Sequence, residues 1–200
     1  MTLAGFSLLL LLAPQNAEPL RPAPPRPGLS WADADALARQ LEELDRRFRA
    51  GAPAPAQSVL VTEAQLNSYL NLVLKMPPGV SNLEIHLDAE RLLARALVDL
   101  DRVQGRLPAQ GPFNPLSLLS GTVPAALKGR LPSRDGFASL QFEEVRLGAF
   151  PIPVSFLAQI ISSATRTPEN PQGFDIQSPF RLPYALKRVR LQPGQAVLEF

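Results

Sequence analysis

The sequence predicts an α+β protein in which a curved antiparallel meander sheet wraps around two apolar helices, preceded by an accessory N-terminal helix. Segments with apolar and polar residues in strict alternation recur from residue 80 to the C-terminus, which is typical of half-buried strands. Residues 63–75 and 154–164 instead carry apolar residues at helical spacing. An antiparallel sheet with one apolar face needs such helices to cover that face.

The composition is that of one domain with an N-terminal extension. The chain has 200 residues, of which 46% are hydrophobic, and this suffices for a sizeable core. The formal net charge is +2, so no global field recruits nucleic acid or anionic lipid. The absence of cysteine excludes disulfides, thiol catalysis and zinc–thiolate sites. The 22 prolines predict short elements joined by stiff corners.

The N-terminus predicts export. Residues 1–17 contain the apolar run Leu3–Ala13, which is shorter than the roughly twenty residues of a membrane-spanning helix but matches the core of a secretion signal. We therefore expect a signal peptide or short membrane anchor, and an extracytoplasmic protein (periplasm or cell envelope) that is secreted or N-terminally anchored. Residues 18–29 form a proline-rich tether. A buried N-terminus and a disordered tail are the alternatives.

Residues 30–50 predict an accessory helix. Ser30 is a suitable N-cap, and Gly51 is well placed to end the helix after a basic last turn. Its narrow leucine stripe predicts packing at the edge of the domain or pairing with another helix. A protein partner could also bind through residues 30–49.

The remaining chain, 57–200, predicts the curved-sheet domain. After a short strand, Thr62 and Gln65 form a capping box for a helix that reaches Lys75. We expect the apolar side chains of this helix to be buried and its polar ones to lie opposite them. The buried set is Leu66, Tyr69, Leu70, Val73 and Leu74, and the polar set is Asn67, Ser68 and Asn71.

Six or seven mostly antiparallel strands and a last helix complete the domain. Alternation predicts a hairpin over 80–103, a strand at 122–131 and a longer strand at 137–147. Pro153 then opens the helix 154–164, and Pro193–Gly194 centres a C-terminal hairpin.

Candidate catalytic groups are sparse. The single histidine, His86, lies on the polar face of a strand, which indicates a solvated residue. Asp99 with Asp101, and Glu143 with Glu144, could hold a cation, but charged outer strand faces show the same spacing. Phosphate-binding glycine loops and hydrolase motifs are absent. The sequence therefore predicts no enzyme, no cofactor and no metal site; a hydrolase would need two carboxylates that converge in a cleft.

The strongest charge signal is C-terminal. No acidic residue separates its four cations, which predicts contact with lipid headgroups or a membrane surface; a solvated strand edge is the alternative. Too few aromatic residues are interleaved for nucleic-acid binding. The four cations are Arg181, Lys187, Arg188 and Arg190.

The two apolar helices suggest a ligand site. If the sheet curls over them, the space between sheet and helices is a groove that could hold an acyl chain; a filled core is the alternative. The predicted lining residues are Leu66, Leu70, Val73, Phe142, Phe156, Leu157, Ile160 and Ile161.

Four segments carry a family resemblance: VTEAQLNSYLN, LEIHLDAERLLARALVDL, DGFASLQFEEVRLGAFPIPVSFLAQII and PFRLPYALKRVRLQPGQAVLEF. Over about residues 58–200 the chain resembles uncharacterised, signal-bearing bacterial envelope proteins similar to the YpmS-like and LmeA-like families, whose folds are likened to tubular lipid-binding domains. The resemblance implies an exported domain that handles lipid or glycolipid. We thus expect a non-enzymatic, envelope-side carrier of an apolar ligand. The alternative is a structural or protein-interaction component of the envelope with a solid core.

Overall fold

The protein is α+β, as the sequence predicts, and its main sheet is open and antiparallel. Most of the predicted N-terminal signal and tether lies outside the described residues. The computed structural model describes residues 27–53, 55, 57–74, 76, 78–104, 120–164, 166, 168 and 170–200, without the side chains of 103, 104, 160, 163 and 164.

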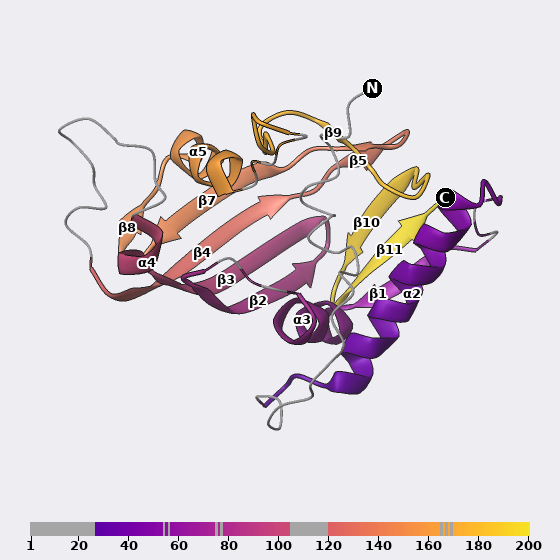
Figure 1. Ribbon diagram of the computed structural model, residues 1–200, viewed down its shortest axis with the longest axis horizontal. Helices are drawn as coiled ribbons and strands as arrows, with labels where there is room; N and C mark the ends of the chain where they lie inside the picture. Colours follow the sequence, from indigo (N-terminus) through magenta and orange to yellow (C-terminus); the bar gives the residue numbers. More distant parts are fainter. Residues whose placement is uncertain are drawn as a thin grey trace.

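The main sheet has five strands in the order β2-β3-β4-β7-β8, and each neighbouring pair is antiparallel (Figure 1). The predicted hairpin supplies its first two strands. The second ends earlier than the expected residue 103, because the chain turns into a short helix, α4, at Leu100. The strands are β2 (Val80–Asp88), β3 (Arg91–Asp99), β4 (Thr122–Arg130), β7 (Gln141–Leu147) and β8 (Phe150–Pro151), and α4 spans Leu100–Gln104.

Two smaller sheets lie beside the main one. The C-terminal sheet has the order β1-β11-β10, and its hairpin turns at Pro193–Gly194, as predicted. The third sheet, β5-β6-β9, is built from two-residue strands, which is why the described residues hold more strands than the expected six or seven. The strands are β1 (Val59–Thr62), β10 (Arg188–Gln192), β11 (Gln195–Glu199), β5 (Ser133–Arg134), β6 (Phe137–Ala138) and β9 (Phe180–Arg181).

The single strand expected at 137–147 is wrong. Residues 139 and 140 leave the ladder, so β6 joins the third sheet and β7 the main sheet. A β-bulge follows, since Lys128 pairs with Glu144 whereas Gly129 pairs with Phe142. The bulge shifts the alternation by one residue. Gly129 permits the close approach, because a Cβ atom there would lie 2.7 Å from the carbonyl oxygen of Gln141.

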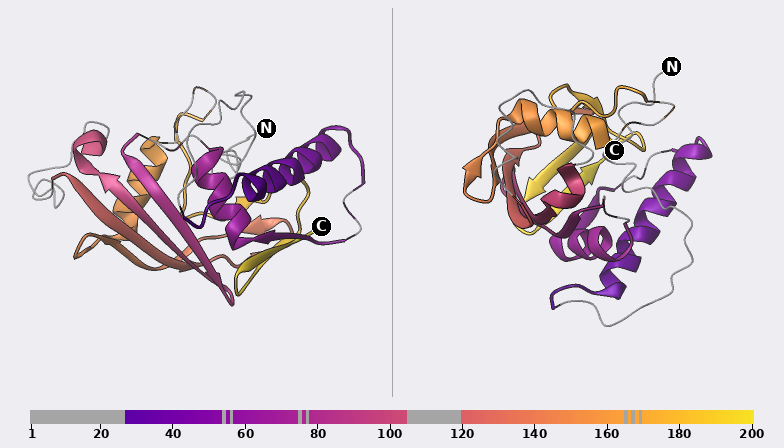
Figure 2. Two further views of the ribbon diagram at one scale, coloured as in Figure 1. Left: turned by 90° about the horizontal axis from the view of Figure 1, so that it is seen from below. Right: turned by 60° about the vertical axis from the view of Figure 1, so that its left-hand side comes forward.

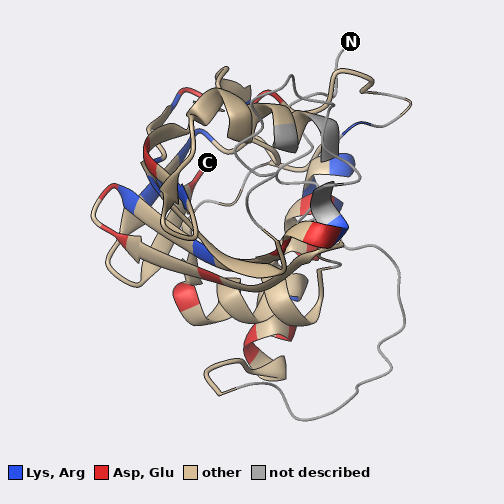
Figure 3. Ribbon diagram, turned by 90° about the vertical axis from the view of Figure 1, so that its left-hand side faces the viewer, with Lys and Arg blue, Asp and Glu red and all other residues tan. Residues whose placement is uncertain are grey.

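Two helices flank the main sheet, α3 (Glu63–Leu72) and α5 (Val154–Ala164). Helix α3 contacts β2 at one margin and α5 contacts β7 at the other. Both lie on the same side of the sheet, which we call its inner face (Figure 2). Seen from the α4 end, the sheet curves between the two helices (Figure 3).

Two polar residues of α3, predicted only to lie opposite its apolar set, bind strand β2. Asn67 donates to the carbonyl oxygen of Ile85 (2.8 Å) and accepts from its amide (2.7 Å). Asn71 donates to the carbonyl oxygen of Leu83 (2.6 Å). These bonds occupy the free edge of β2, whose main-chain groups would otherwise be unpaired.

The contact repeats along α3. One turn before Asn67, the Oε2 atom of Glu63 accepts from the amide of Leu87 (2.8 Å). Four residues of helix advance about 6 Å and two residues of strand about 6.6 Å, so the two elements stay in step. Ser68, the third residue expected opposite the apolar set, is fully buried, and its hydroxyl accepts from the amide of Ser30 (3.0 Å).

Helix α2 (Trp31–Arg49) is capped by Ser30 and followed by Gly51 at positive φ, as predicted. It pairs with α3. Burial raises the pKa of Tyr69, at the centre of this contact, to about 12. The cluster is completed by Leu37, Leu41, Leu44, Val61 and Tyr184.

Candidate ligand site

The inner face of the main sheet is apolar along its full described width. Residues that are paired directly across antiparallel strands share a face. The register places Ile85 beside Ala94 and Ala94 beside Leu127, with Ala96 beside Ala125. No charged side chain occupies this face on β2, β3, β4 or β7. Its members are Ile85, Leu87, Leu92, Ala94, Ala96, Val98, Val123, Ala125, Leu127, Phe142, Val145 and Leu147.

Burial on this face is high at its ends and lower at its centre. Leu87 is 3% exposed and Leu147 is 8% exposed, and each belongs to a packed cluster. Between them, Ala94, Ala96 and Leu127 are only partly buried and take no part in the clusters formed by the described residues. We call Ala94, Ala96, Ala125 and Leu127 the alanine strip.

The strip is bounded on the α3 side by Leu66. This side chain packs against the cluster of Leu87, Leu191 and Ala196. Leu70 and Val73 follow on the same side of α3, one and two turns on. Leu70 is partly buried and Val73 is 41% exposed.

Helix α5 bounds the other side. Phe156 is 8% exposed and packs with Leu100, Leu147 and Ile152, which closes the end of the strip near Val98. Small side chains at the centre of an apolar face leave depth that leucine or phenylalanine would fill. The alanine strip is therefore a partly exposed apolar surface between two packed clusters.

The predicted lining residues divide between the margins of the alanine strip and the packed cores. Phe142, Leu157 and Ile161 pack against the cluster around Phe174 and Ile176. The side chain of Ile160 lies outside the described residues. Ala94 and Ala96 are not among the predicted lining residues, although the alternation within the predicted hairpin 80–103 places them on its apolar face. Their small size within that alternating run was the available signal.

The outer face of the same strands is charged. Glu143 pairs with Arg130 (2.8 Å) and Arg91 (3.5 Å), and Lys128 pairs with Glu144 (3.5 Å). The hydrogen bond from Arg130 is the main cause of the lowered pKa of Glu143. The β-bulge brings both Glu143 and Glu144 to the outer face, where these ion pairs occupy the two carboxylates that the sequence analysis considered for binding a cation.

His86 lies on the same outer side, with its Nδ1 atom 3.1 Å from the Oε2 atom of Glu63. Asp99 and Asp101 do not share a strand face, because β3 ends at Asp99. Asp99 accepts from the amide of Arg102, three residues on, and Asp101 accepts from that of Gly121, just before β4, so both carboxylates bind main-chain groups. Among the described residues, no group of three or more histidines and carboxylates could hold a metal ion.

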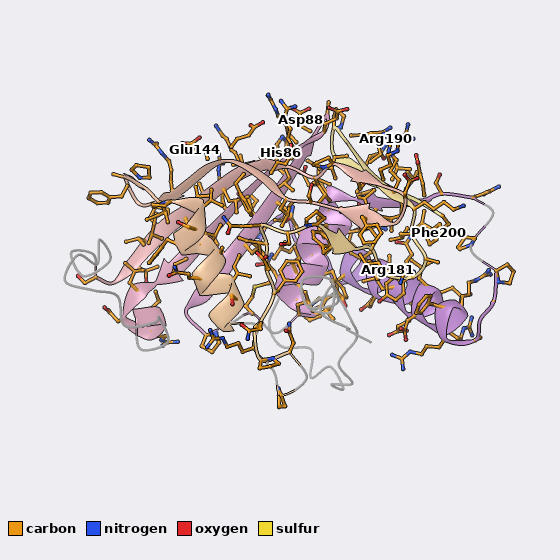
Figure 4. All side chains as sticks on the ribbon, turned by 90° about the horizontal axis from the view of Figure 1, so that it is seen from above. His86, Asp88, Glu144, Arg181, Arg190 and Phe200 are labelled. Atoms are coloured by element: carbon orange, nitrogen blue, oxygen red, sulfur yellow. The ribbon has the colours of Figure 1, made fainter. Side chains whose placement is uncertain are left out.

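The predicted basic cluster is distributed over two sheets. Arg190 lies with His86, Asp88 and Glu144 along the outer side, and Arg181 is apart from them (Figure 4). Arg190 pairs with Glu199 (3.2 Å). Lys187 and Arg188 are exposed between the two positions.

Two hollows lie away from the alanine strip. One, of about 760 Å³, separates α2 from residues 55–59 and includes Gln40, whose buried Oε1 atom has no hydrogen-bond partner among the described residues. Arg39 and Arg47 line its polar side. The other, of about 290 Å³, is a hollow on the outer face formed by Glu84, His86, Leu93 and Arg95.

Comparison with known proteins adds no relative. No protein-family model, no curated protein and no solved structure matches the chain. Within the described part of the chain, no helix is long and apolar enough to span a membrane. The function of the site must therefore be inferred from its geometry.

Proposed function

We propose that the protein is a non-enzymatic, envelope-side binder or carrier of an apolar ligand, a lipid or glycolipid whose acyl chain lies on the alanine strip. The supporting observation is the strip itself: small, partly buried side chains at the centre of an uncharged face between packed walls. An acyl chain needs only such a surface, because its burial is driven by the loss of water contact and has no directional requirement.

The dimensions suit a chain-like ligand. Strands lie about 4.8 Å apart, so β2 and β7, which are three spacings apart, are separated by about 14 Å. Helix α3 docks at the outer edge of β2 and α5 over β7, which leaves the middle strands between them. A hydrocarbon chain placed across β3 and β4 would contact Val73 on one side and Phe156 on the other.

The discriminating experiment fills the strip. In Ala96→Phe, a ring occupies the space proposed for the ligand. The control is Ala126→Phe, which places the same ring on the outer face of the neighbouring strand β4, where residue 126 pairs with Arg95 and Arg146. Both proteins are purified, examined by native mass spectrometry for bound lipid, and titrated with cis-parinaric acid.

We expect Ala96→Phe to fold with unchanged or increased stability, to lose the co-purified lipid, and to bind the fluorescent fatty acid at least tenfold more weakly than the control. If the strip is solid core, overpacking should instead destabilise Ala96→Phe by about 1–3 kcal/mol. That result, with no lipid bound by the unmodified protein, would favour the structural or interaction protein over the carrier.

A further inference from the structure

Three side chains form a row on the exposed face of the third sheet. Arg134 pairs with Phe137 across the β5–β6 hairpin, and Phe137 pairs with Arg181 across β6 and β9. The next register pair, Ala138 with Phe180, points into the core, with exposed fractions of 2% and 6%. Alternation therefore directs the row outwards. We call Arg134, Phe137 and Arg181 the Arg–Phe–Arg row.

The hairpin turn holds this row in place. Asp135 and Gly136 both have positive φ (52° and 84°), the conformation of the two central residues in a type I′ turn. The amide of Gly136 donates to the carbonyl oxygen of Lys187 (2.9 Å), and the amide of Leu182 donates to that of Gly136 (2.8 Å). A third cation, Lys187, is thereby tied beside the row.

The row combines an open aromatic ring with positive charge. Phe137 is 53% exposed although most large apolar side chains of the described residues are covered. Arg134 contacts Asp135 (3.2 Å), with both side chains almost fully exposed. No acidic side chain among the described residues forms an ion pair with Arg181 or Lys187. The charge is available to an anionic partner.

We propose that the Arg–Phe–Arg row, with Lys187, is a docking surface for an anionic membrane. Strand spacing places a cation about 5 Å to either side of the ring. The aromatic side chain can enter the headgroup region of the bilayer while the cations on either side of it contact lipid phosphates. Neither hollow described above includes the row, and a fluid bilayer, unlike a small anion, needs no concave site.

This surface differs from the four-cation cluster that the sequence predicts. Arg181 and Lys187 remain, and Arg134 and Phe137 join them through strand pairing. Arg190 is left out because it lies apart from Arg181, along the outer side of the molecule (Figure 4). Membrane docking does not require the alanine strip to hold a ligand. A negative result in the vesicle experiment therefore leaves the fatty-acid binding proposal untouched, and the reverse also holds.

The test is co-sedimentation of the full chain with sucrose-loaded vesicles. One set is pure phosphatidylcholine and the other contains about one-third phosphatidylglycerol, which supplies negative surface charge. We expect binding to the anionic vesicles only, and its loss at about 0.5 M salt, where screening is strong.

Matched variants locate the contact. Arg181→Ala should weaken vesicle partitioning about fivefold and Phe137→Ala about tenfold. Their controls are Arg95→Ala, an exposed cation of the outer face, and Phe150→Ala, a ring with a similar exposed fraction (51%) on β8. Both controls should bind as the unmodified protein does.

Three results would overturn the proposal: no binding to anionic vesicles, equal loss in the controls, or equal binding to neutral vesicles. Retention on immobilised heparin without vesicle binding would also overturn it, and would indicate a soluble polyanion as the partner.

Discussion

Helices α3 and α5 cover opposite margins of one sheet but attach to it by different interactions. Helix α5 contributes Phe156 to a packed apolar cluster on the face of the sheet. Helix α3 is attached through Glu63, Asn67 and Asn71, which bind the main-chain edge of β2. Apolar packing tolerates small shifts, whereas hydrogen bonds to a strand edge set one register. Hydrogen bonds to β2 therefore set the register of the α3 wall, whereas the α5 wall is held by apolar packing.

The largest expected effect lies in the α5 wall. Phe156→Ala removes a buried ring from the cluster with Leu147 and Ile152, and the free energy of unfolding should fall by about 3–5 kcal/mol. Urea denaturation measures the loss. Phe150→Ala, which removes a half-exposed ring, should change it by less than about 0.5 kcal/mol. Equal losses would show that α5 is not held by apolar packing.

The α3 wall should respond next most strongly. Asn67→Ala leaves both the amide and the carbonyl oxygen of Ile85 unpaired at a partly buried edge, and should cost about 2–3 kcal/mol. Asn71→Ala removes one bond to the strand, to Leu83, and should cost about half as much. Denaturation of the two variants under one set of conditions provides the comparison. A larger loss for Asn71→Ala would contradict the proposed roles.

A second asparagine variant tests geometry. Asn67→Asp keeps an acceptor for the amide of Ile85 but places a carboxylate against its carbonyl oxygen, which should raise the pKa of the new carboxyl group. A group whose pKa is raised in the folded state stabilises the protein below its unfolded-state pKa, and this stabilisation is lost as pH rises through its folded-state pKa. The deficit of Asn67→Asp relative to the unmodified protein should thus be larger at pH 7 than at pH 3. A deficit independent of pH would show that the side chain has left the strand edge.

The sequence predicted the contacts of α5 better than those of α3, and a single criterion explains both outcomes. Apolar residues at helical spacing correctly indicated α5 and the leucines of α2. The same criterion placed Asn67 and Asn71 opposite the apolar set without indicating a partner, because amphipathic periodicity cannot distinguish water from a strand edge as the partner of a polar stripe. The bulge at Glu143 was also missed, since it depends on the pairing of Gly129 with a strand that lies later in the sequence.

The candidate site was predictable to a similar extent. The alternation in β3 and β4 gave an apolar face, and the helix stripes gave its walls. The open centre was not predictable, because it depends on which inner positions the helices leave uncovered. Likewise, the pairing of Phe137 with Arg181 was not predictable, because it joins segments more than forty residues apart.

The contact between α3 and α2 can be tested through the ionisation of Tyr69 at alkaline pH. Burial raises its pKa to about 12, from an ordinary value near 10. A group whose folded pKa is raised contributes stability that is complete below the unfolded value and is lost as pH rises through the folded value. The melting temperature should therefore decline between about pH 10 and pH 12, and Tyr69→Phe should decline less. Identical alkaline profiles would mean that this phenol is not buried against α2.

The smallest effect should come from the charge on α3. Glu63→Gln keeps an oxygen that can accept from the amide of Leu87 and removes only the charge near His86 and at the start of the helix. Exposed ion pairs and charges at helix ends each contribute less than about 1 kcal/mol, so the loss should stay near that value and shrink in about 0.5 M salt. Denaturation at low and high salt measures it. A loss as large as that of Asn67→Ala would show that electrostatic attraction, rather than hydrogen bonding to the strand edge, holds α3 on the sheet, and the contrast with α5 would then be one of charge.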